Sequence, residues 1–220
     1  TDAQKEEYLA IIEEESLRLA AMATNVMNLT KVENQTILTD LTTFNLSEQI
    51  RACVLLLEEK WSRKELDLDL EFPEYTIRAN EELLKQVWIN LLDNAIKFTP
   101  AGGTIKFHVE KLGPEVEISI WNSGQGISPE ALPYVFQRFY KEDRSRGLHA
   151  RGAGLGLNIC KVLVNLSGGQ IRVESQQGEW CQFVFTLPAT PPNPSGMKRL
   201  PDESGQPVPV EDPASMKPVN

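Results

Sequence analysis

The 220-residue sequence predicts a domain of the mixed α/β (α+β) class, preceded by a long helix and followed by an irregular tail. Three observations predict this organisation. Apolar residues repeat at helical spacing over residues 4–32. Helix-type and strand-type patterns then alternate from residue 45 to residue 188. Nine of the 14 prolines lie from Pro188 onward, where no apolar period remains.

The composition is that of a globular protein, with 41% hydrophobic and 24% charged residues. No apolar run approaches 18 residues, so we expect no membrane span and no direct membrane contact. The net charge of −9 argues against nucleic-acid binding. Cys53, Cys160 and Cys181 lack metal-site spacing, so we expect three buried free thiols in a reducing compartment. The chain does not begin with Met, and we expect a fragment or a processed form.

The first predicted element is the helix over residues 4–32, within a first unit of residues 1–33. Its small or apolar residues alternate steps of three and four, the spacing of a helix bundle. They are Leu9, Ile12, Ser16, Leu19, Ala23, Val26 and Thr30. One helix cannot bury this face alone, so we expect a partner helix. The alternative is a helix that folds back on its own domain.

The period is lost over residues 34–44, which we interpret as a linker before the main domain of residues 45–188. A second helix should begin near Asn45 or Ser47, either of which could cap it, and run through Trp61. Further helices are predicted over 80–97 and 154–168. Strands are predicted over 66–72, 104–113, 114–121, 171–175 and 181–188. A long loop with one short helix should fill 122–153, and residues 189–220 form the predicted disordered tail.

The helix over 80–97 combines a wide apolar face with an unusual polar one. Steps of three and four place Asn90, Asp93, Asn94 and Lys97 together. Amide oxygens can ligate a hard cation, a carboxylate can hold its water, and a lysine can reach a phosphate. A plain solvated face is the alternative interpretation.

Two glycine clusters flank the long loop. NSGQGI (122–127) follows a predicted strand, and RGAGLGL (151–157) opens a predicted helix whose N-terminus could bind a phosphate. The loop between them is basic although the chain is acidic, which suits an anionic ligand such as a triphosphate. We expect Phe136, Phe139 and Tyr140 to anchor the base of the loop. A flexible turn is the simpler explanation of either cluster alone.

These segments together resemble a known family. NLLDNAIKFT (90–99), NSGQGI (122–127), FQRFY (136–140) and GAGLGL (152–157) look like the four nucleotide-binding boxes of a sensor histidine kinase of two-component systems. Residues 4–32 resemble the second helix of that family's dimerisation and phosphotransfer hairpin. The resemblance implies a two-layer α/β sandwich, a mixed sheet with helices on one face. Three of the boxes also occur in gyrase, mismatch-repair ATPases and heat-shock chaperones.

The resemblance also implies site residues for ATP and Mg²⁺. Asn90 and Asn94 would hold Mg²⁺, and Asp93 and Lys97 would complete the catalytic set. The other nucleotide-binding positions would be Asn122, Gly124, Gly126, Ile127, Phe136, Arg138, Tyr140, Lys141, Gly152, Gly154, Leu155, Gly156 and Leu157. Lys97, Arg138 and Lys141 would contact phosphate, and the last glycines would receive phosphates at a helix start.

Two features depart from the family pattern. The phosphate-accepting histidine is absent, because His108 lies in a predicted strand and His149 in the loop. We therefore expect this chain to bind nucleotide but not to phosphorylate itself. Asn122 stands where the family has an aspartate that accepts from the adenine amino group. An amide still accepts but can rotate to donate, so we hypothesise weaker discrimination between ATP and GTP.

The resemblance implies that the γ-phosphoryl of ATP passes to a histidine and then to an aspartate of a response regulator. It also implies a homodimer through the hairpin helices, and a cytoplasmic location in a membrane-anchored bacterial sensor. A nucleotide-binding regulatory module without kinase activity is the alternative, kept open by Asn122. A chaperone-like or topoisomerase-like ATPase is a third.

Overall fold

The computed structural model describes residues 40–141 and 154–189, together with five helical positions nearer the N-terminus, Lys5, Tyr8, Leu9, Ile12 and Ser16. The rest of the predicted helix over 4–32 lies outside the described residues. So do Gly152, His149 and all of the predicted tail except residue 189.

The described elements follow the predicted order, except for two additional short strands and one predicted helix that is divided at Leu57. They are β1 (Thr42–Asn45), α2 (Leu46–Leu56), α3 (Glu58–Arg63), β2 (Asp67–Asp69), β3 (Thr76–Ala79), α4 (Glu81–Phe98), β4 (Thr104–Leu112), β5 (Glu115–Ser123), a short 3₁₀ helix (Leu132–Tyr134), α5 (Gly156–Leu166), β6 (Ile171–Gln176) and β7 (Trp180–Pro188).

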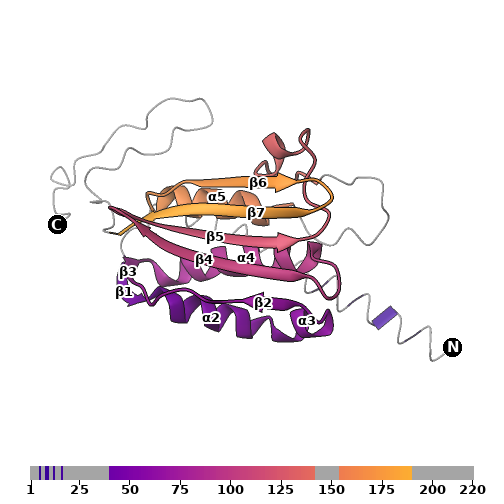
Figure 1. The fold of residues 1–220 in the computed structure, drawn as a ribbon, viewed down its shortest axis with the longest axis horizontal. Helices are drawn as coiled ribbons and strands as arrows, with labels where there is room; N and C mark the ends of the chain where they lie inside the picture. The colour runs from indigo at the N-terminus through magenta and orange to yellow at the C-terminus, as the bar shows by residue number, and fades with distance from the viewer. Residues whose placement is uncertain are drawn as a thin grey trace, which may run out of the picture.

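The main sheet has five strands in the order β2-β4-β5-β7-β6. β2 runs parallel to β4, and the other neighbours are antiparallel, so the sheet is mixed as predicted. α4 and α5 lie together against one face (Figure 1), which makes the predicted two-layer sandwich. A separate antiparallel pair, β1 with β3, lies at the edge of the domain.

The core lies between the helices and the inner face of the sheet. Trp88 of α4 is 1% exposed and packs on Phe185 of β7, with ring centroids 5.0 Å apart. Its indole N–H donates to Gln49 Oε1 over 2.7 Å, so the buried ring leaves no polar atom unpaired. This packing fixes the direction of α4 across the sheet, and with it the polar side chains on the other face of α4.

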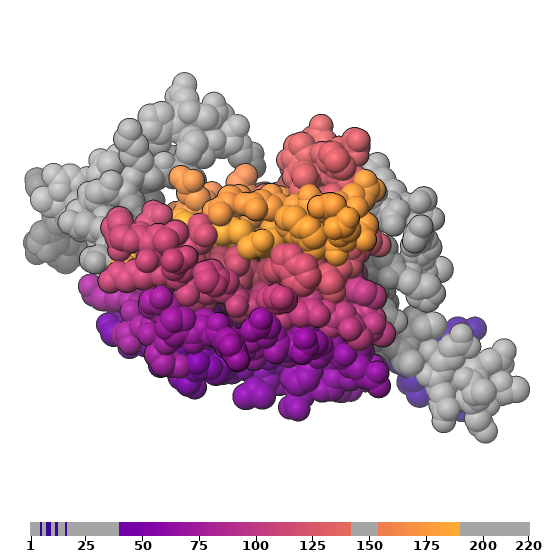
Figure 2. All heavy atoms as spheres, in the orientation of Figure 1, coloured from indigo at the N-terminus to yellow at the C-terminus, as the bar shows by residue number. Residues whose placement is uncertain are grey.

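The other face of the sheet has no described helix over it and forms the front surface in Figure 2. Its side chains are largely polar, and Arg172 of β6 pairs with Glu117 and Glu174. Lys106 lies over the ring of Trp121, 5.6 Å from its centroid. The helix face and the solvent face of each strand alternate, as the sequence pattern predicts.

Several sequence predictions are confirmed. Of the two predicted caps for α2, Asn45 fills the role, since its side chain accepts from Glu48 N–H. α4 begins after Asn80 as predicted, and the Asn80 side chain accepts from Leu83 N–H. The three cysteines, which lie in α2, α5 and β7, are buried as predicted.

None of the helices in the described part of the chain combines the length and apolar character needed to cross a membrane.

Other predictions need correction. The segment predicted as a linker over 34–44 contains most of β1, so the domain begins before residue 45. The helix predicted through Trp61 breaks at Leu57, and the strand predicted over 66–72 is reduced to Asp67–Asp69. β3 was not predicted, because its four residues give too short a pattern.

Candidate functional site

The polar face of α4 carries a half-buried amide that is only partly satisfied. Asn90 Oδ1 accepts a hydrogen bond from Gln86 Nε2 over 3.2 Å. Asn90 Nδ2 is buried and has no acceptor among the described residues, although the Cys160 thiol is close enough for the amide to influence its pKa. Asn94 follows one turn later and is also half-buried. An amide with spare hydrogen-bonding capacity is a position where a ligand gains binding energy.

The first residue of α5 meets this amide. A Cβ built on Gly156 would lie 3.7 Å from Oδ1 and Cγ of Asn90. The free N–H groups of a helix N-terminus therefore lie beside the partly satisfied amide of α4. This junction joins two of the sequence motifs, which lie more than fifty residues apart in the chain.

Asp93 and Lys97, two charged residues of α4, contact different neighbours. Asp93 forms a short ion pair with Lys60 of α3, so this carboxylate is shared with another helix. Lys97 lies over the ring of Phe98, with its Nζ 4.9 Å from the ring centroid. Burial and the nearby charge of Lys141 lower the pKa of Lys97, while Asp93 opposes that shift. Two cations held close together attract an anionic ligand.

Asn122 lies near the end of β5, on the face of the sheet that packs against the helices. Its side chain is 3% exposed, and Nδ2 donates to the Ser123 carbonyl oxygen over 3.1 Å. Rotating the amide would bring Oδ1 against that carbonyl, acceptor against acceptor. The hydrogen bond therefore favours one orientation and opposes the free rotation expected from the sequence.

The turn after β5 is held by the β6–β7 hairpin. Gly124 N–H donates to the Glu179 carbonyl over 3.0 Å, and Gly178 N–H donates to the Gln125 carbonyl over 2.6 Å. Gly126 has a φ of 62° and leaves no room for a Cβ beside the Gln176 carbonyl. These glycines serve the backbone packing of the turn, in addition to any contact with a ligand.

Ile127 and Phe136 begin the long loop and are both tied to the domain. Ile127 N–H donates to Ser175 Oγ over 2.8 Å. The Phe136 ring packs edge-on against Phe183 at 6.2 Å, and its carbonyl accepts from Asn158 Nδ2 over 3.0 Å. Oδ1 of Asn158 is buried without a donor among the described residues. The expected anchoring by Phe136 is confirmed.

The expected anchoring by Phe139 is wrong. Its φ is 63°, and its side chain is 69% exposed. The backbone turns here because Phe139 N–H donates to the Gly154 carbonyl over 2.9 Å, and this reversal points the ring outward. Gly154 itself has a φ of 69° and lies against the backbone of Phe139 and Tyr140. Tyr140 packs on Tyr134 instead, at 5.8 Å.

The remaining predicted positions are less constrained. Arg138 and Lys141 are exposed, while Leu155 is 4% exposed and Leu157 packs against the core. Gly152 lies outside the described residues, as do the loop cations after Lys141. The structure therefore places Gly156 beside Asn90, and Lys141 close enough to Lys97 to affect its pKa, with Asn94 between Asn90 and Lys97 on the same helix.

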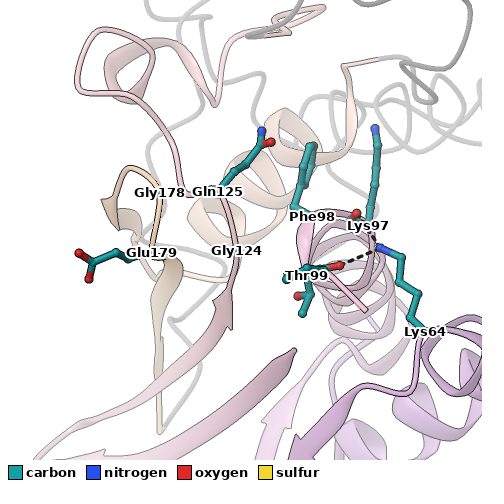
Figure 3. Close-up of a pocket in the computed structure, with 9 residues that line it drawn as sticks. Lys64, Lys97, Phe98, Thr99, Gly124, Gln125, Gly178 and Glu179 are labelled. Atoms are coloured by element: carbon teal, nitrogen blue, oxygen red, sulfur yellow. Dashed lines mark hydrogen bonds between the residues drawn. The ribbon is translucent and has the colours of Figure 1, made fainter. Parts of the chain in front are cut away.

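A hollow of about 570 Å³ lies at the C-terminal end of α4 (Figure 3). It lies between that helix end and the glycine turn after β5. Its lining is Lys64, Lys97, Phe98, Thr99, Pro100, Gly124, Gln125, Gly178 and Glu179. Sequence reasoning did not assign Lys64 or Phe98 to the site. Phe98 lies within the motif at 90–99, whereas nothing in the local sequence marks Lys64.

Asn90 and Asn94 are suitable in kind for Mg²⁺. Amide oxygens are hard donors, and two of them leave most octahedral positions for water and for the oxygens of a ligand. Asn90 Oδ1 accepts one hydrogen bond, from Gln86, and an amide oxygen has a second lone pair with which it could ligate a cation. The residues present therefore fit a magnesium ion that is shared with a bound phosphate.

Comparisons with known proteins identify the family and the fold. Residues 79–191 match the family described as histidine kinase-, DNA gyrase B-, and HSP90-like ATPase. The sensor protein SrrB of Staphylococcus aureus is 30% identical over 190 residues, which cover 83% of this chain and 31% of SrrB. The chain thus spans less than a third of the curated relatives that it matches.

Solved structures of histidine kinases share the fold. The catalytic domain of ThkA is 34% identical, with a TM-score of 0.61 over 70% of this chain and 98% of that one. ThkA in complex with the response regulator TrrA gives 32% identity and a TM-score of 0.67, covering 84% of this chain and 51% of that one. Full-length ShkA in complex with AMPPNP gives 25% and 0.72, covering 86% and 40%.

Proposed function

Since this chain belongs to the histidine kinase-, DNA gyrase B- and HSP90-like ATPase family, we propose that it is the ATP-binding catalytic part of a sensor histidine kinase. The single observation that carries this proposal is the junction of Asn90 with Gly156. It puts a partly satisfied amide beside the N-terminus of a helix, where phosphate oxygens are favoured. The ShkA complex with AMPPNP supports the same ligand class.

The side chains around this junction suit a triphosphate. Lys97 and Lys141 supply positive charge, and Asn90 and Asn94 supply amide oxygens for Mg²⁺. When bound, Mg²⁺ would neutralise charge on the phosphates. The chain's own work is to fix the nucleotide in place, which supplies much of the barrier lowering in phosphoryl transfer.

The proposed reaction moves the γ-phosphoryl of ATP to a histidine outside this chain. His108 is a poor acceptor, because it lies in β4 and pairs with Glu110 at 3.5 Å on the outer face of the sheet. From the histidine the phosphoryl would pass to an aspartate of a response regulator, a partner class supported by the ThkA–TrrA complex. We place the domain in the cytoplasm and expect homodimerisation through the hairpin helices.

A regulatory module that binds nucleotide without kinase activity is the second candidate. Asn122 favours it, because a neutral amide makes a weaker hydrogen bond to an adenine amino group than a carboxylate does. In that case the chain would still bind ATP, and only phosphoryl transfer would be lost.

The test is phosphoryl transfer in a longer chain that includes the preceding histidine helix. We expect label from the γ-phosphoryl of ATP to appear on a histidine and then on an added response regulator. The variants compared are Gly156→Ala, which should reduce labelling at limiting ATP, and Lys111→Met on the exposed end of β4, which should not. ATP binding without labelling would favour the regulatory module, and absence of ATP binding would refute both candidates.

A further inference from the structure

The C-terminal end of α4 has carbonyl groups that the helix cannot satisfy. Thr99 N–H and Oγ1 both donate to the Ala95 carbonyl, over 2.9 and 2.6 Å. The Ile96 carbonyl would next need the N–H of residue 100, but that residue is proline and has none. The last turn of α4 therefore needs a donor from elsewhere in the chain.

Lys64 supplies that donor from the turn between α3 and β2. Its Nζ donates to the carbonyl oxygens of Ile96, Lys97 and Thr99 over 2.7, 2.9 and 2.9 Å. Three acceptors match the three N–H bonds of an ammonium group. A cation at this position also interacts favourably with the C-terminal end of the helix dipole. Partial burial lowers the pKa of Lys64 from its ordinary value.

The main chain of Lys64 reinforces this contact. Its carbonyl accepts from Gly102 N–H over 2.9 Å, in the turn that follows α4. Three residues after Lys64, Asp67 N–H donates to the Gly103 carbonyl of the same turn over 2.9 Å. Lys64 thus holds the end of α4 through its side chain and the following turn through its backbone.

Lys97 and Thr99, two of the residues held in this way, line the hollow together with Lys64. Figure 3 shows Lys64 reaching the helix end from one side, with Lys97 and Phe98 extending from the same turn. Gly124 is so close to the Phe98 carbonyl that a Cβ on Gly124 would lie 2.5 Å from its oxygen. A small shift of this helix turn would therefore move Lys97, Phe98 and the glycine turn together.

We propose that Lys64 is a positioning residue for nucleotide binding, which acts by fixing the last turn of α4 through three carbonyl oxygens. It does not touch the nucleotide, because its ammonium hydrogens are directed at the helix end. This inference rests on the proposed function, since it concerns the affinity of the same site for ATP.

The test compares Lys64→Met with Lys111→Met, which removes an exposed lysine at the end of β4. We expect Lys64→Met to weaken ATP binding about tenfold, as for the loss of hydrogen bonds to a charged group. Lys111→Met should change the affinity by less than about twofold. Lys64→Arg keeps donors and charge and should recover most of the affinity.

Salt distinguishes positioning from the mere loss of a positive charge. Raising the ionic strength from about 0.1 M to about 1 M shortens the Debye length from about 10 to about 3 Å. If Lys64 acts by position, the ratio of affinities between wild type and Lys64→Met stays the same. A ratio that falls to one at high salt, or a Lys64→Met variant that binds like the wild type, would overturn the proposal.

A second measurement needs no variant and covers the case in which Lys64→Met does not fold. The ammonium protons of Lys64 should exchange with water much more slowly than those of Lys111 in nuclear magnetic resonance spectra of the wild-type chain. Equal exchange rates in a chain that binds ATP would contradict the three-carbonyl contact. Failure of the wild-type chain to bind ATP would instead refute the proposed function, which keeps the two failures distinct.

Discussion

Gly156, the first residue of α5, lies directly against the side chain of Asn90 in α4, where an added Cβ would be 3.7 Å from Oδ1. This distance is an ordinary van der Waals contact, so the protein itself does not exclude a methyl group here. The lack of a side chain is explained better by what must approach between the two helices. In the proposed function, that is a phosphate group with its magnesium ion.

Gly156→Ala should therefore separate binding from stability. Alanine is favoured over glycine in a helix by about 0.5–1 kcal/mol, so the variant should be at least as stable as the wild type. Its methyl group would occupy the approach to the helix N-terminus and lower ATP affinity by about tenfold or more. Calorimetric titration and urea unfolding measure the two quantities. Undiminished affinity would remove Gly156 from the site.

Gly126→Ala should behave in the opposite way. Its φ of 62° and the nearby Gln176 carbonyl both oppose a side chain, so we expect a loss of more than about 2 kcal/mol in unfolding free energy. Gly178→Ala is the matched control, because its φ is 87° but nothing lies within 4 Å of an added Cβ. Urea unfolding of both variants should show the smaller loss for Gly178→Ala; equal losses would mean that the carbonyl contact is unimportant.

Asn122→Asp tests the base-recognising position. A carboxylate would accept from an adenine amino group more strongly, by about 1 kcal/mol or roughly fivefold in ATP affinity. It would oppose the carbonyl of guanine, so the preference for ATP over GTP should rise. The same carboxylate would lie beside the Ser123 carbonyl at a position that is 3% exposed, which should lower the melting temperature without ligand.

The two arms of that experiment have different meanings. Titration with ATP and GTP reports recognition, and thermal unfolding without nucleotide reports the cost of the buried charge. Equal discrimination by wild type and variant would contradict the hypothesis that a rotating amide weakens base selectivity. That result is expected if the hydrogen bond from Nδ2 to the Ser123 carbonyl keeps Oδ1 as the acceptor.

The buried cysteines should make the fold sensitive to alkaline pH. Burial raises the pKa of Cys53 from 9.0 to about 11 and that of Cys160 from 9.0 to about 12. The unfolded chain therefore loses these protons first, and stability falls as pH rises above about 9, by up to about 1.4 kcal/mol per unit for each thiol. A Cys53→Ala/Cys160→Val variant should show a flatter decline between pH 9 and pH 11. Parallel profiles would contradict the assignment.

The sequence predicts the elements whose signals are local. α2 and α4 have clear apolar periods, so their starts were predicted near Asn45 or Ser47 and near Asn80, and the structure shows Asn45 and Asn80 as the caps. β1 and β3 are four residues each and stabilise one another across more than thirty residues, so neither has a sufficient pattern of its own. The break at Leu57 has no glycine or proline to mark it.

The site residues also include some that the sequence predicts and others that it does not. Asn90, Lys97 and Gly156 belong to recognisable motifs, and the packing of α4 on α5 brings Gly156 beside Asn90. The role of Lys64 depends on which carbonyl groups remain unsatisfied after folding, and no sequence pattern records this. Phe139 belongs to a motif and was expected to anchor the loop, yet its backbone has a positive φ and its side chain is exposed.

The most direct test of the central claim is calorimetric titration of this chain with ATP, with and without Mg²⁺. The account predicts saturable ATP binding that strengthens when Mg²⁺ is present, because Asn90 and Asn94 supply oxygen donors beside the N-terminus of α5. Gly156→Ala in the same titration should bind at least about tenfold more weakly. No binding of ATP in either condition, by a chain whose fold is intact, would contradict the account.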